Sequence, residues 1–503
     1  MKRRALIIWL VTGIAVSVWL PGLRAQEPGG DKGTSVSAVE RKNRAPVNKE
    51  ILRVRLPEPK ETKLANGLTV LVLERHELPT VTLTLWVETG ALADPKDLPG
   101  LATFTAEMLR EGTARRSSAQ LAAETDDIGA TLNTSAEFGS SVSTVSASGL
   151  VDNLDKLLDL MSDVVLNPTF PADELEKFKT RQLAELEQQR STPEFLSQEK
   201  FFQVLYRDFP AAVISPTPDS VKQVTVAELK RFHEQYYAPN NAILGVAGDV
   251  TLDQLKPQLE KYFGEWKNRP VTQPDLRVLP PPAAKKIYLV DRPKSVQTNI
   301  VAGDYALRRS DPDYIPLFVM NRILGGGPTG RLFLNLREEK GYTYGAYSYF
   351  TADIYRGPWI ASTEVRNAVT DGSMHELMAE FKRMRSEQVP ENELDDARRS
   401  IVASFALSLE QPATLLRYAM TVKYYNLPED YYNRYPEEVA KVTPDVVQRM
   451  AQKYVDLDHL QVVCVGDGSQ IKTVLEKYGP VEVYDTEGKP VTEKAAAAGK
   501  SGR

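Results

Sequence analysis

An arginine and a tyrosine in the second half of the chain have the types and spacing that point most directly to chemistry. Arg337 and Tyr344 lie seven residues apart, on either side of a predicted helix end. The rigid fork of arginine donors and the directional tyrosine hydroxyl suit a peptide carbonyl, or the oxyanion that forms from it during hydrolysis. The alternative is that both side chains serve ordinary surface and core packing. On spacing alone, both interpretations stay open.

A glycine-rich turn and a helix must position this pair. The turn leads into an amphipathic segment with Leu332 and Leu336 on one side, which ends at Gly341 and is followed by a strand-like run of tyrosines. The turn is predicted to be either a substrate-contacting loop or a simple helix-to-helix connection. Its glycines are Gly325, Gly326, Gly327 and Gly330.

The composition is that of an ordinary globular protein. The chain has 503 residues, of which 42% are apolar and 26% charged, and this length suits roughly two to four domains. A net charge of −5 gives no electrostatic footprint for nucleic acid. Cys464 is the only cysteine, so stability must come from packed cores rather than from an internal disulfide.

The N-terminus predicts a secretory signal. Lys2, Arg3 and Arg4 precede an apolar run from Ala5 to Leu20, and Ala25 is a suitable small residue before a cleavage point. The alternative is an uncleaved membrane anchor, but the run is short for a bilayer span of about 20 residues. We therefore expect an exported protein, periplasmic if the source is bacterial, with membrane attachment only if the signal remains uncleaved.

The folded part predicts an α+β protein. Asn66-Gly67 is typical of a tight hairpin turn, and the alternation over Val81–Val87 indicates a strand. Longer amphipathic segments separate the strands, which predicts antiparallel-rich sheets with helices packed to one side.

A repeat predicts two homologous halves. Gly245-Val-Ala-Gly-Asp249 resembles Val463-Cys-Val-Gly-Asp467, an offset of 467 − 249 = 218 residues, and repeated landmarks of this kind indicate duplication. The predicted order is a signal peptide 1–25, a flexible tether 26–54, an N-terminal half 55–270, a linker 271–284, a C-terminal half 285–482 and a disordered tail 483–503.

Several short motifs follow one another in a characteristic order. Together they resemble the insulinase/pitrilysin family of zinc metallopeptidases, in particular its short two-chain members related to mitochondrial processing peptidase. This resemblance covers roughly residues 60–480 and implies two homologous α/β-sandwich halves in a clamshell arrangement. The motifs include Leu64-Ala-Asn-Gly-Leu-Thr-Val70, Pro99-Gly-Leu-Ala102, Met108-Leu-Arg-Glu-Gly-Thr113, Tyr237-Ala-Pro-Asn-Asn241 and Leu336-Arg-Glu-Glu-Lys-Gly341.

The family's zinc motif is degenerate in this sequence. In the family, H-x-x-E-H on a helix supplies two histidine ligands and a glutamate base. The alignment places Thr103 and Glu107 at the histidine positions and Ala106 at the base. Glu185 falls at the third ligand, where a solvated helix face is the alternative. The chain is therefore expected to bind no catalytic zinc, because no two of its histidines are within five residues of each other: His76, His233, His375 and His459.

The resemblance still implies a function for such a chain. In the two-chain members, one subunit carries zinc and the other supplies an arginine–tyrosine pair, which falls here on Arg337 and Tyr344. The glycine-rich turn resembles the corresponding loop of the noncatalytic subunit. We therefore expect a noncatalytic, substrate-positioning subunit of an exported heterodimeric zinc endopeptidase. Zinc is expected in a homologous partner, and the substrate is a peptide or an unfolded protein.

Two other functions stay open. One is a noncatalytic scaffold or peptide-binding clamp, like the core subunits of the respiratory cytochrome complex in the same superfamily. The other is a free-standing peptidase with unusual chemistry, which the sequence disfavours because it contains no G-x-S-x-G motif. A cluster of tyrosines is predicted to fill a domain core rather than to bind a ligand: Tyr424, Tyr425, Tyr431, Tyr432 and Tyr435.

Overall fold

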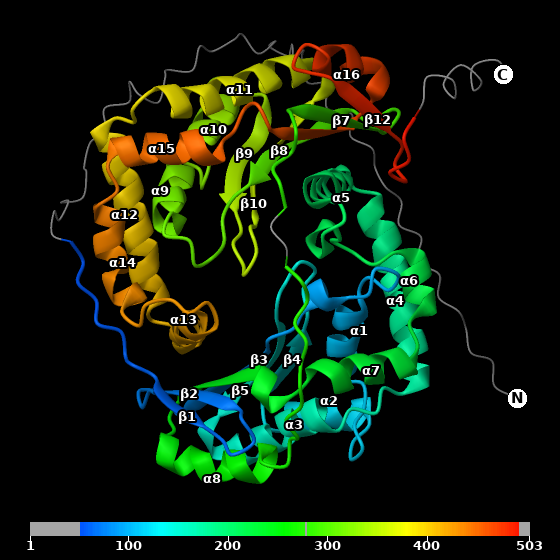
Figure 1. The fold of residues 1–503 in the computed structure, drawn as a ribbon, viewed down its shortest axis with the longest axis vertical. Helices are drawn as coiled ribbons and strands as arrows, with labels where there is room; N and C mark the ends of the chain where they lie inside the picture. Colours follow the sequence, from blue (N-terminus) through cyan, green and yellow to red (C-terminus); the bar gives the residue numbers. More distant parts are fainter. Residues whose placement is uncertain (1–50, 277–278, 492–503) are drawn as a thin grey trace, which may run out of the picture. The chain divides into compact units, whose positions relative to one another are not determined.

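The computed structural model describes residues 51–276 and 279–491. The predicted signal peptide and most of the predicted tether lie outside the described residues. The described residues belong to one compact unit built around two six-stranded sheets (Figure 1). This confirms the prediction of an α+β fold with two antiparallel-rich sheets.

The first sheet has the strand order β1-β2-β6-β3-β5-β4. The Asn66-Gly67 turn connects the antiparallel pair β1 and β2, as predicted. Along β3, Val81, Leu83 and Leu85 are buried while the threonines between them are partly exposed, which matches the period of two in the sequence. The strands are β1 (Lys60–Lys63), β2 (Thr69–Glu74), β3 (Thr80–Val87), β4 (Thr131–Ser135), β5 (Ser143–Leu150) and β6 (Ala242–Gly248).

The second sheet repeats this arrangement in the order β12-β7-β11-β8-β10-β9. Its strand β11 is fully buried and runs parallel to β7 and antiparallel to β8, as β6 does between β2 and β3. The repeat predicted from the segments ending at Asp249 and Asp467 therefore corresponds to equivalent central strands. The strands are β7 (Lys286–Asp291), β8 (Gln297–Tyr305), β9 (Thr343–Phe350), β10 (Pro358–Arg366), β11 (Gln461–Gly466) and β12 (Val481–Tyr484).

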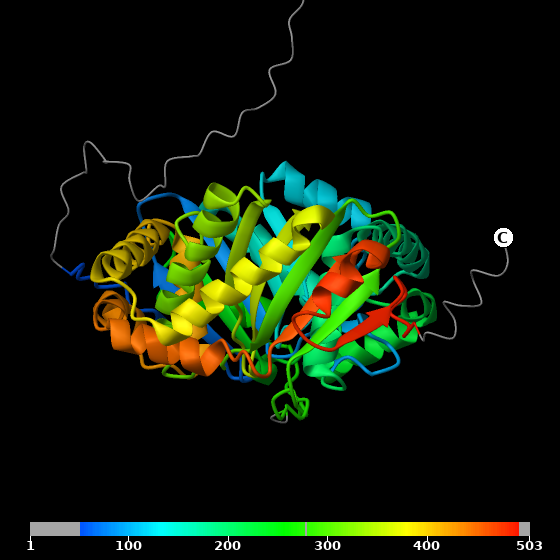
Figure 2. The same ribbon diagram turned by 90° about the horizontal axis from the view of Figure 1, so that it is seen from above.

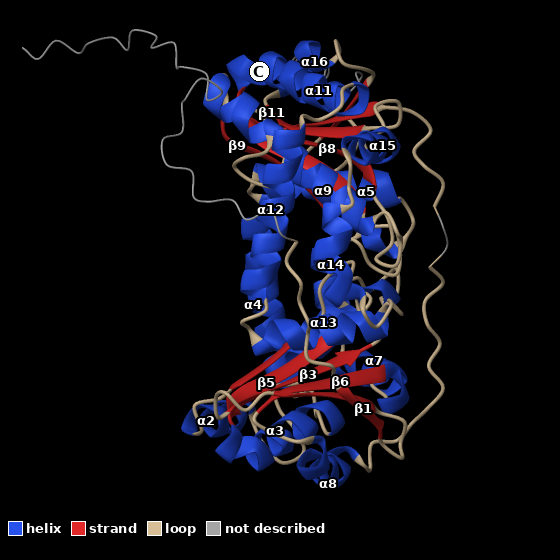
Figure 3. Cartoon of the chain, turned by 90° about the vertical axis from the view of Figure 1, so that its left-hand side faces the viewer, coloured by secondary structure: helices blue, strands red, loops and turns tan. Residues whose placement is uncertain are grey.

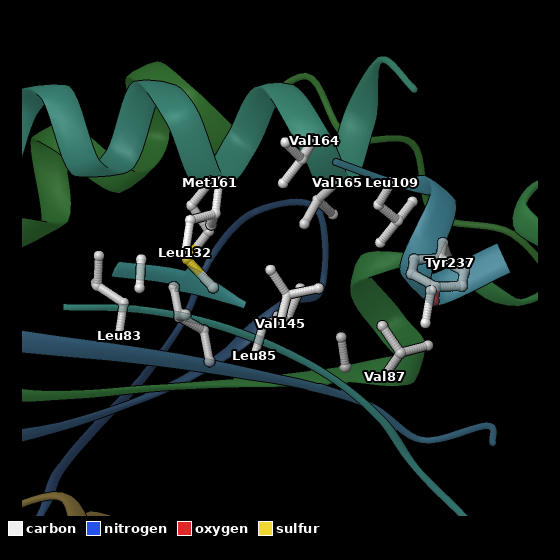
Figure 4. Close-up of a cluster of buried hydrophobic side chains, with 14 of the residues drawn as sticks. Leu83, Leu85, Val87, Leu109, Leu132, Val145, Met161, Val164, Val165 and Tyr237 are labelled. Carbon is white, nitrogen blue, oxygen red and sulfur yellow. The ribbon is translucent and has the colours of Figure 1, made fainter. Parts of the chain in front are cut away.

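Helices cover one face of the first sheet. Leu83 and Leu85 of β3 face Met161 of α3 in a buried cluster that continues to Tyr237 (Figure 4). The helices of this part of the chain are α1 (Leu101–Met108), α2 (Ser118–Asp127), α3 (Leu154–Leu166), α4 (Ala172–Arg190), α5 (Pro193–Tyr206), α6 (Pro218–Gln223), α7 (Val226–Tyr236) and α8 (Leu252–Phe263).

The second sheet is covered in the same way. Helices α11, in yellow, and α16, in red, lie across its outer face (Figure 2), and Phe381 of α11 packs edge-on against Trp359 of β10. The helices are α9 (Tyr314–Leu324), α10 (Arg331–Phe333), α11 (Thr370–Ser386), α12 (Glu391–Ser408), α13 (Pro412–Tyr424), α14 (Tyr431–Ala440), α15 (Pro444–Tyr454) and α16 (Gly468–Leu475).

Each half also sends one helix onto the other half's sheet. Helix α5 packs on β8 and β11, with Phe201 and Tyr206 in one core with Val301 and Val463. Helix α13 packs on β2 and β6, on the face opposite α2, α3 and α8 (Figure 3). The sheets therefore carry their own helices on one face, as predicted, and an exchanged helix on the other.

The predicted disordered tail begins too early. Val483 and Tyr484 belong to strand β12, which extends the second sheet through β7. Tyr484 also bridges to Pro490, and Arg190 Nη2 donates to the Thr486 carbonyl at 3.0 Å. Ordered structure continues because these backbone groups find partners within the fold. Within the described ranges 51–276 and 279–491, no helix is long and apolar enough to cross a membrane.

Candidate functional site

Arg337 lies on a short helical irregularity that leaves its charge open to solvent. It belongs to a π-helical segment, Leu334–Glu339, that follows α10. Its guanidinium lies 4.8 Å from the centre of the Phe333 ring and 3.3 Å from Glu338 Oε1, and 45% of the side chain is exposed. Segments of this kind are rare in helices and frequent at functional sites.

Tyr344 lies on a β-bulge of the edge strand β9. Thr343 is opposite Val365 and Ala346 is opposite Thr363, so Tyr344 and Gly345 together face the single intervening residue of β10. Bulges at sheet edges redirect a side chain, and Tyr344 is 91% exposed. Contacts within the fold therefore do not explain why a tyrosine occupies this position.

A glycine turn connects the π-helical segment that carries Arg337 to strand β9, which carries Tyr344. Gly341 has a φ of +62°, and its N–H donates to the Arg337 carbonyl at 3.1 Å. The Tyr342 N–H donates to the Leu336 carbonyl at 2.9 Å, which closes the helix end as a left-handed glycine cap does. Within the described part of the chain, no hydrogen bond joins Arg337 to Tyr344. That they converge on one substrate group stays a prediction.

Two more tyrosines extend the surface beside this pair. Tyr347 and Tyr349 are each 40% exposed on β9, and the Tyr347 ring lies 5.5 Å from the Phe333 ring on which Arg337 stacks. Tyr347 belongs to the run of tyrosines predicted as a strand, but Tyr349 was not predicted. The spacing of two between them was the available signal, because alternate strand residues share a face.

The glycine-rich turn is tightly packed. A Cβ at Gly325 would lie 2.5 Å from Ser348 N, and one at Gly330 would lie 2.9 Å from Gly325 Cα. Arg322 Nη1 donates to the Gly326 carbonyl at 2.5 Å, and Gly327 is partly exposed. These contacts explain the glycines as a turn between α9 and α10. Substrate contact by this turn stays a prediction.

Helix α1 is the helix on which the sequence alignment places the degenerate zinc motif. Thr103 Oγ1 donates to the Ala136 carbonyl at 2.6 Å, so the hydroxyl is already engaged. Ala106 is buried and offers no ligand atom. Glu107 lies 3.8 Å from Arg110, and burial, with the neighbouring carboxylates of Glu111 and Glu137, raises the pKa of its carboxyl group.

The facing helix α4 does not complete a metal site. Glu185 is exposed and accepts hydrogen bonds from Gln182 and Gln189 of its own helix. Between α1 and α4, the Phe104 and Phe178 rings meet edge to face at 5.0 Å. Apolar rings therefore form the contact between these two helices, and the hydrogen bonds that Glu185 accepts from Gln182 and Gln189 both stay within its own helix.

Three of the four histidines have partners away from helix α1. His76 pairs with Asp249 at 2.6 Å, and His459 pairs with Asp456 at 2.7 Å. His233 lies 2.7 Å from the Val165 carbonyl, and burial lowers its pKa to about 4. Within residues 51–276 and 279–491, no three histidine, cysteine, aspartate or glutamate side chains form a group that could hold a metal ion. The residues at the family's zinc position therefore do not fit zinc.

Asp94 controls the start of helix α1 and predicts a pH effect. Its carboxylate accepts the Gly100 N–H at 2.7 Å and the Ala102 N–H at 2.8 Å. Burial raises its pKa to about 7, although these two donors act in the opposite direction. Between pH 4 and 7 the unfolded chain has lost this proton while the native chain keeps it. Raising the pH over this range therefore costs stability.

We expect Asp94→Asn to remove this contribution, because asparagine does not titrate. The advantage of wild type over the variant in melting temperature should shrink as the pH rises from about 4 to 7. Thermal denaturation of both proteins across this range measures the difference. A difference that stays constant with pH would contradict the assignment to Asp94.

The fold defines the class of protein: two repeated α/β halves, each of which sends one helix onto the sheet of the other. Family models agree. The one described as insulinase (peptidase family M16) matches residues 69–216, and the one described as peptidase M16 inactive domain matches residues 223–401. The chain belongs to the insulinase, or M16, peptidase family.

Several relatives share most of the chain. An uncharacterized zinc protease of Bacillus subtilis is 24% identical over 355 residues, covering 69% of this chain and 83% of its own length. The crystal structure of a peptidase M16 inactive domain from Pseudomonas fluorescens is 29% identical. It superposes with a TM-score of 0.75 over 81% of this chain and 98% of its own. The periplasmic protease PqqL from Escherichia coli is 14% identical with a TM-score of 0.68, over 85% of this chain and 51% of its own, which shows the fold alone.

Proposed function

We propose that this protein is the noncatalytic, substrate-positioning subunit of an exported, two-chain zinc endopeptidase of the M16 family. Its own helix α1 presents Thr103 and Ala106 where a ligand and a base are required. Peptide hydrolysis therefore depends on a homologous partner that carries the zinc. Peptides or unfolded proteins are the substrates, and the N-terminal signal directs the chain to an extracytoplasmic compartment.

Arg337 and Tyr344 carry the substrate-positioning role in this proposal. Arginine presents a planar fork of charged donors and tyrosine a single hydroxyl donor. Both groups can donate hydrogen bonds to the carbonyl oxygen of the peptide bond being cleaved. Donors aimed at an oxygen that gains negative charge stabilise the transition state more than the ground state.

The single observation that supports the proposal most is the exposure of Tyr344. A tyrosine that is 91% exposed on a bulged edge strand contributes little to folding, and the arginine seven residues before it is 45% exposed. Tyrosine is enriched at interaction sites because its ring is apolar and its hydroxyl is polar. The family membership supplies the substrate class, because M16 proteins are named as peptidases.

Reconstitution tests the proposal. The purified chain is mixed with an M16 homologue from the same organism that carries an intact H-x-x-E-H helix, and peptide cleavage is measured against the homologue alone. We expect kcat to rise on mixing, and gel filtration to show a complex. Cleavage that is no faster in the mixture than with the homologue alone would refute the proposal.

A peptide-binding clamp without a role in proteolysis is the second candidate. The exposed Tyr344, Tyr347 and Tyr349 side chains favour it, because they offer ring surface to a peptide without needing a metal. Titration of a peptide onto the isolated chain separates the two candidates. A clamp binds the peptide alone and leaves the homologue's kcat unchanged.

A further inference from the structure

A cavity among helices α9, α12, α13 and α14 lies outside the features described so far. It has a volume of about 400 Å³, within the range of small-ligand sites. Its wall contains three arginines, several tyrosines and serines, and no aspartate or glutamate of the described residues. Of the tyrosines predicted to fill a core, Tyr432 and Tyr435 pack against Phe405, but Tyr425, Tyr432 and Tyr435 also line this cavity.

The decisive residue is Arg309, which is only 7% exposed. Its guanidinium donates to the hydroxyls of Tyr431 at 3.2 Å and Tyr432 at 3.1 Å. It also lies 3.9 Å from the centre of the Tyr314 ring. Within the described part of the chain, no carboxylate lies within 4.0 Å of this guanidinium. A buried charge without an opposite charge is costly, so such a group is normally paired.

The other two arginines place further positive charge on the same cavity. Arg322 Nη2 donates to Ser400 Oγ at 2.5 Å, and Arg417 is exposed with its guanidinium 5.3 Å from the Tyr418 ring. Neither arginine has an ion-pair partner in residues 51–276 and 279–491. Asp353 lies behind the wall, where its carboxylate accepts a hydrogen bond from the Tyr425 hydroxyl. The same carboxylate accepts a second hydrogen bond from Ser141 Oγ at 2.5 Å.

The rest of the wall suits an apolar or aromatic group. Tyr418 and Tyr432 are stacked with ring centres 4.1 Å apart, and Phe318 and Ile401 line the same space. The wall therefore combines guanidinium groups, which match the two oxygens of a carboxylate, with ring faces that bind apolar side chains.

We propose that this cavity binds an organic carboxylate that carries an apolar or aromatic group, such as the C-terminal residue of a peptide. Arg309 supplies the central positive charge, and Arg417 lies at the exposed side. The choice of a peptide as the source of the carboxylate rests on the proposed function. Binding of a carboxylate in this cavity does not rest on the proposed function, because it can be measured on the isolated chain.

The test compares N-acetyl-phenylalanine with N-acetyl-phenylalaninamide by isothermal titration calorimetry on the full chain. These probes differ only in the carboxylate. We expect the acid to bind about 10-fold or more tightly than the amide, because a hydrogen bond between charged groups is stronger than one between a charged and a neutral group. Equal binding of acid and amide, no binding of the acid, or binding of inorganic phosphate without the acid would each overturn the proposal.

Variants assign the binding to the cavity. Arg309→Gln should weaken binding of N-acetyl-phenylalanine by about 10-fold or more. Because Arg309 is buried, the exposed Arg417→Gln serves as a second variant and should weaken binding a few-fold. Arg434→Gln is the matched control, since Arg434 on α14 is 51% exposed and pairs with Glu438 away from the cavity. Unchanged binding in a folded Arg309→Gln protein would overturn the proposal.

A further pair of probes identifies the source of the carboxylate. An eight-residue peptide ending in phenylalanine is titrated with a free C-terminus and with a C-terminal amide. Preference for the free terminus supports capture of peptide ends. Binding of N-acetyl-phenylalanine but of neither peptide supports a small carboxylic acid as the ligand. Both titrations use the isolated chain and require no partner subunit. Failure of the reconstitution experiment can therefore be distinguished from failure of the cavity to bind a carboxylate.

Discussion

Arg337→Ala is expected to lower kcat of the reconstituted two-chain peptidase by about 10²–10³-fold, the typical cost of losing one donor to a developing oxyanion. The reason lies in the surroundings of Arg337. Its guanidinium contacts the Phe333 ring and Glu338, and almost half of the side chain is exposed. Its removal should therefore leave the fold and the complex intact. Steady-state kinetics and gel filtration of the mixed subunits measure both effects.

Tyr344→Phe gives a sharper version of the same test, because it removes only the hydroxyl of an exposed ring. We expect a lower kcat with little change in thermal stability. Arg434→Ala is the matched control for Arg337→Ala, since the two side chains are 51% and 45% exposed, and it should leave kcat unchanged. If kcat of both site variants equals that of wild type, the pair has no role in positioning the substrate.

Gly245→Val is expected to produce the largest loss of stability, by overpacking the site where helix α13 crosses strand β6. A Cβ at Gly245 would lie 2.6 Å from Met420 Sδ and 2.7 Å from Leu416 Cδ1. Both partners are buried, so they have little room to move. Overpacking of this kind typically costs about 1–3 kcal/mol. Thermal unfolding should show a lower melting temperature, and hydrogen exchange in α13 should become faster.

A second substitution tests the cause of that loss. Met420→Ala removes the sulfur that an added side chain would meet, but it leaves a cavity of its own. The double variant should therefore lose less stability than the sum of the two single variants, because the added valine fills part of the space. Strictly additive losses would show that Gly245 does not set the approach of α13 to β6.

The arrangement of strands and helices within each half was largely predictable from the sequence. Alternation in β3, the Asn66-Gly67 turn and the repeat 245–249 and 463–467 are local signals, and the strands form where these signals lie. The candidate site was predictable only in part. The sequence placed Arg337 and Tyr344 across a helix end, but the bulge that exposes Tyr344 depends on pairing with β10.

The exchanged helices show why the remaining features could not be predicted from the sequence. Helix α5 looks in sequence like any amphipathic helix of the first half. Its Phe201 nevertheless packs so closely on Gly303 of the second half that a Cβ at Gly303 would lie 2.7 Å from the Phe201 ring. Contacts between residues about a hundred positions apart leave no periodic trace in a local window, since periodicity reports only which face is buried and not what covers it. For the same reason the sequence did not reveal the cavity around Arg309, since the two tyrosines that it hydrogen-bonds lie more than 120 positions away.

The sequence by itself determined two properties of this protein: a repeated α+β architecture, and the threonine and alanine at the two positions that the alignment matches to a metal ligand and a base of the family. Residue identity decides the second, because the alanine methyl group cannot act as a base and threonine is not among the usual ligands of zinc. The tertiary structure alone decided which helix covers which sheet, that Tyr344 points into solvent, and that three arginines line a cavity to which the described residues contribute no acid. These properties depend on contacts between distant segments, which form only when the whole chain packs.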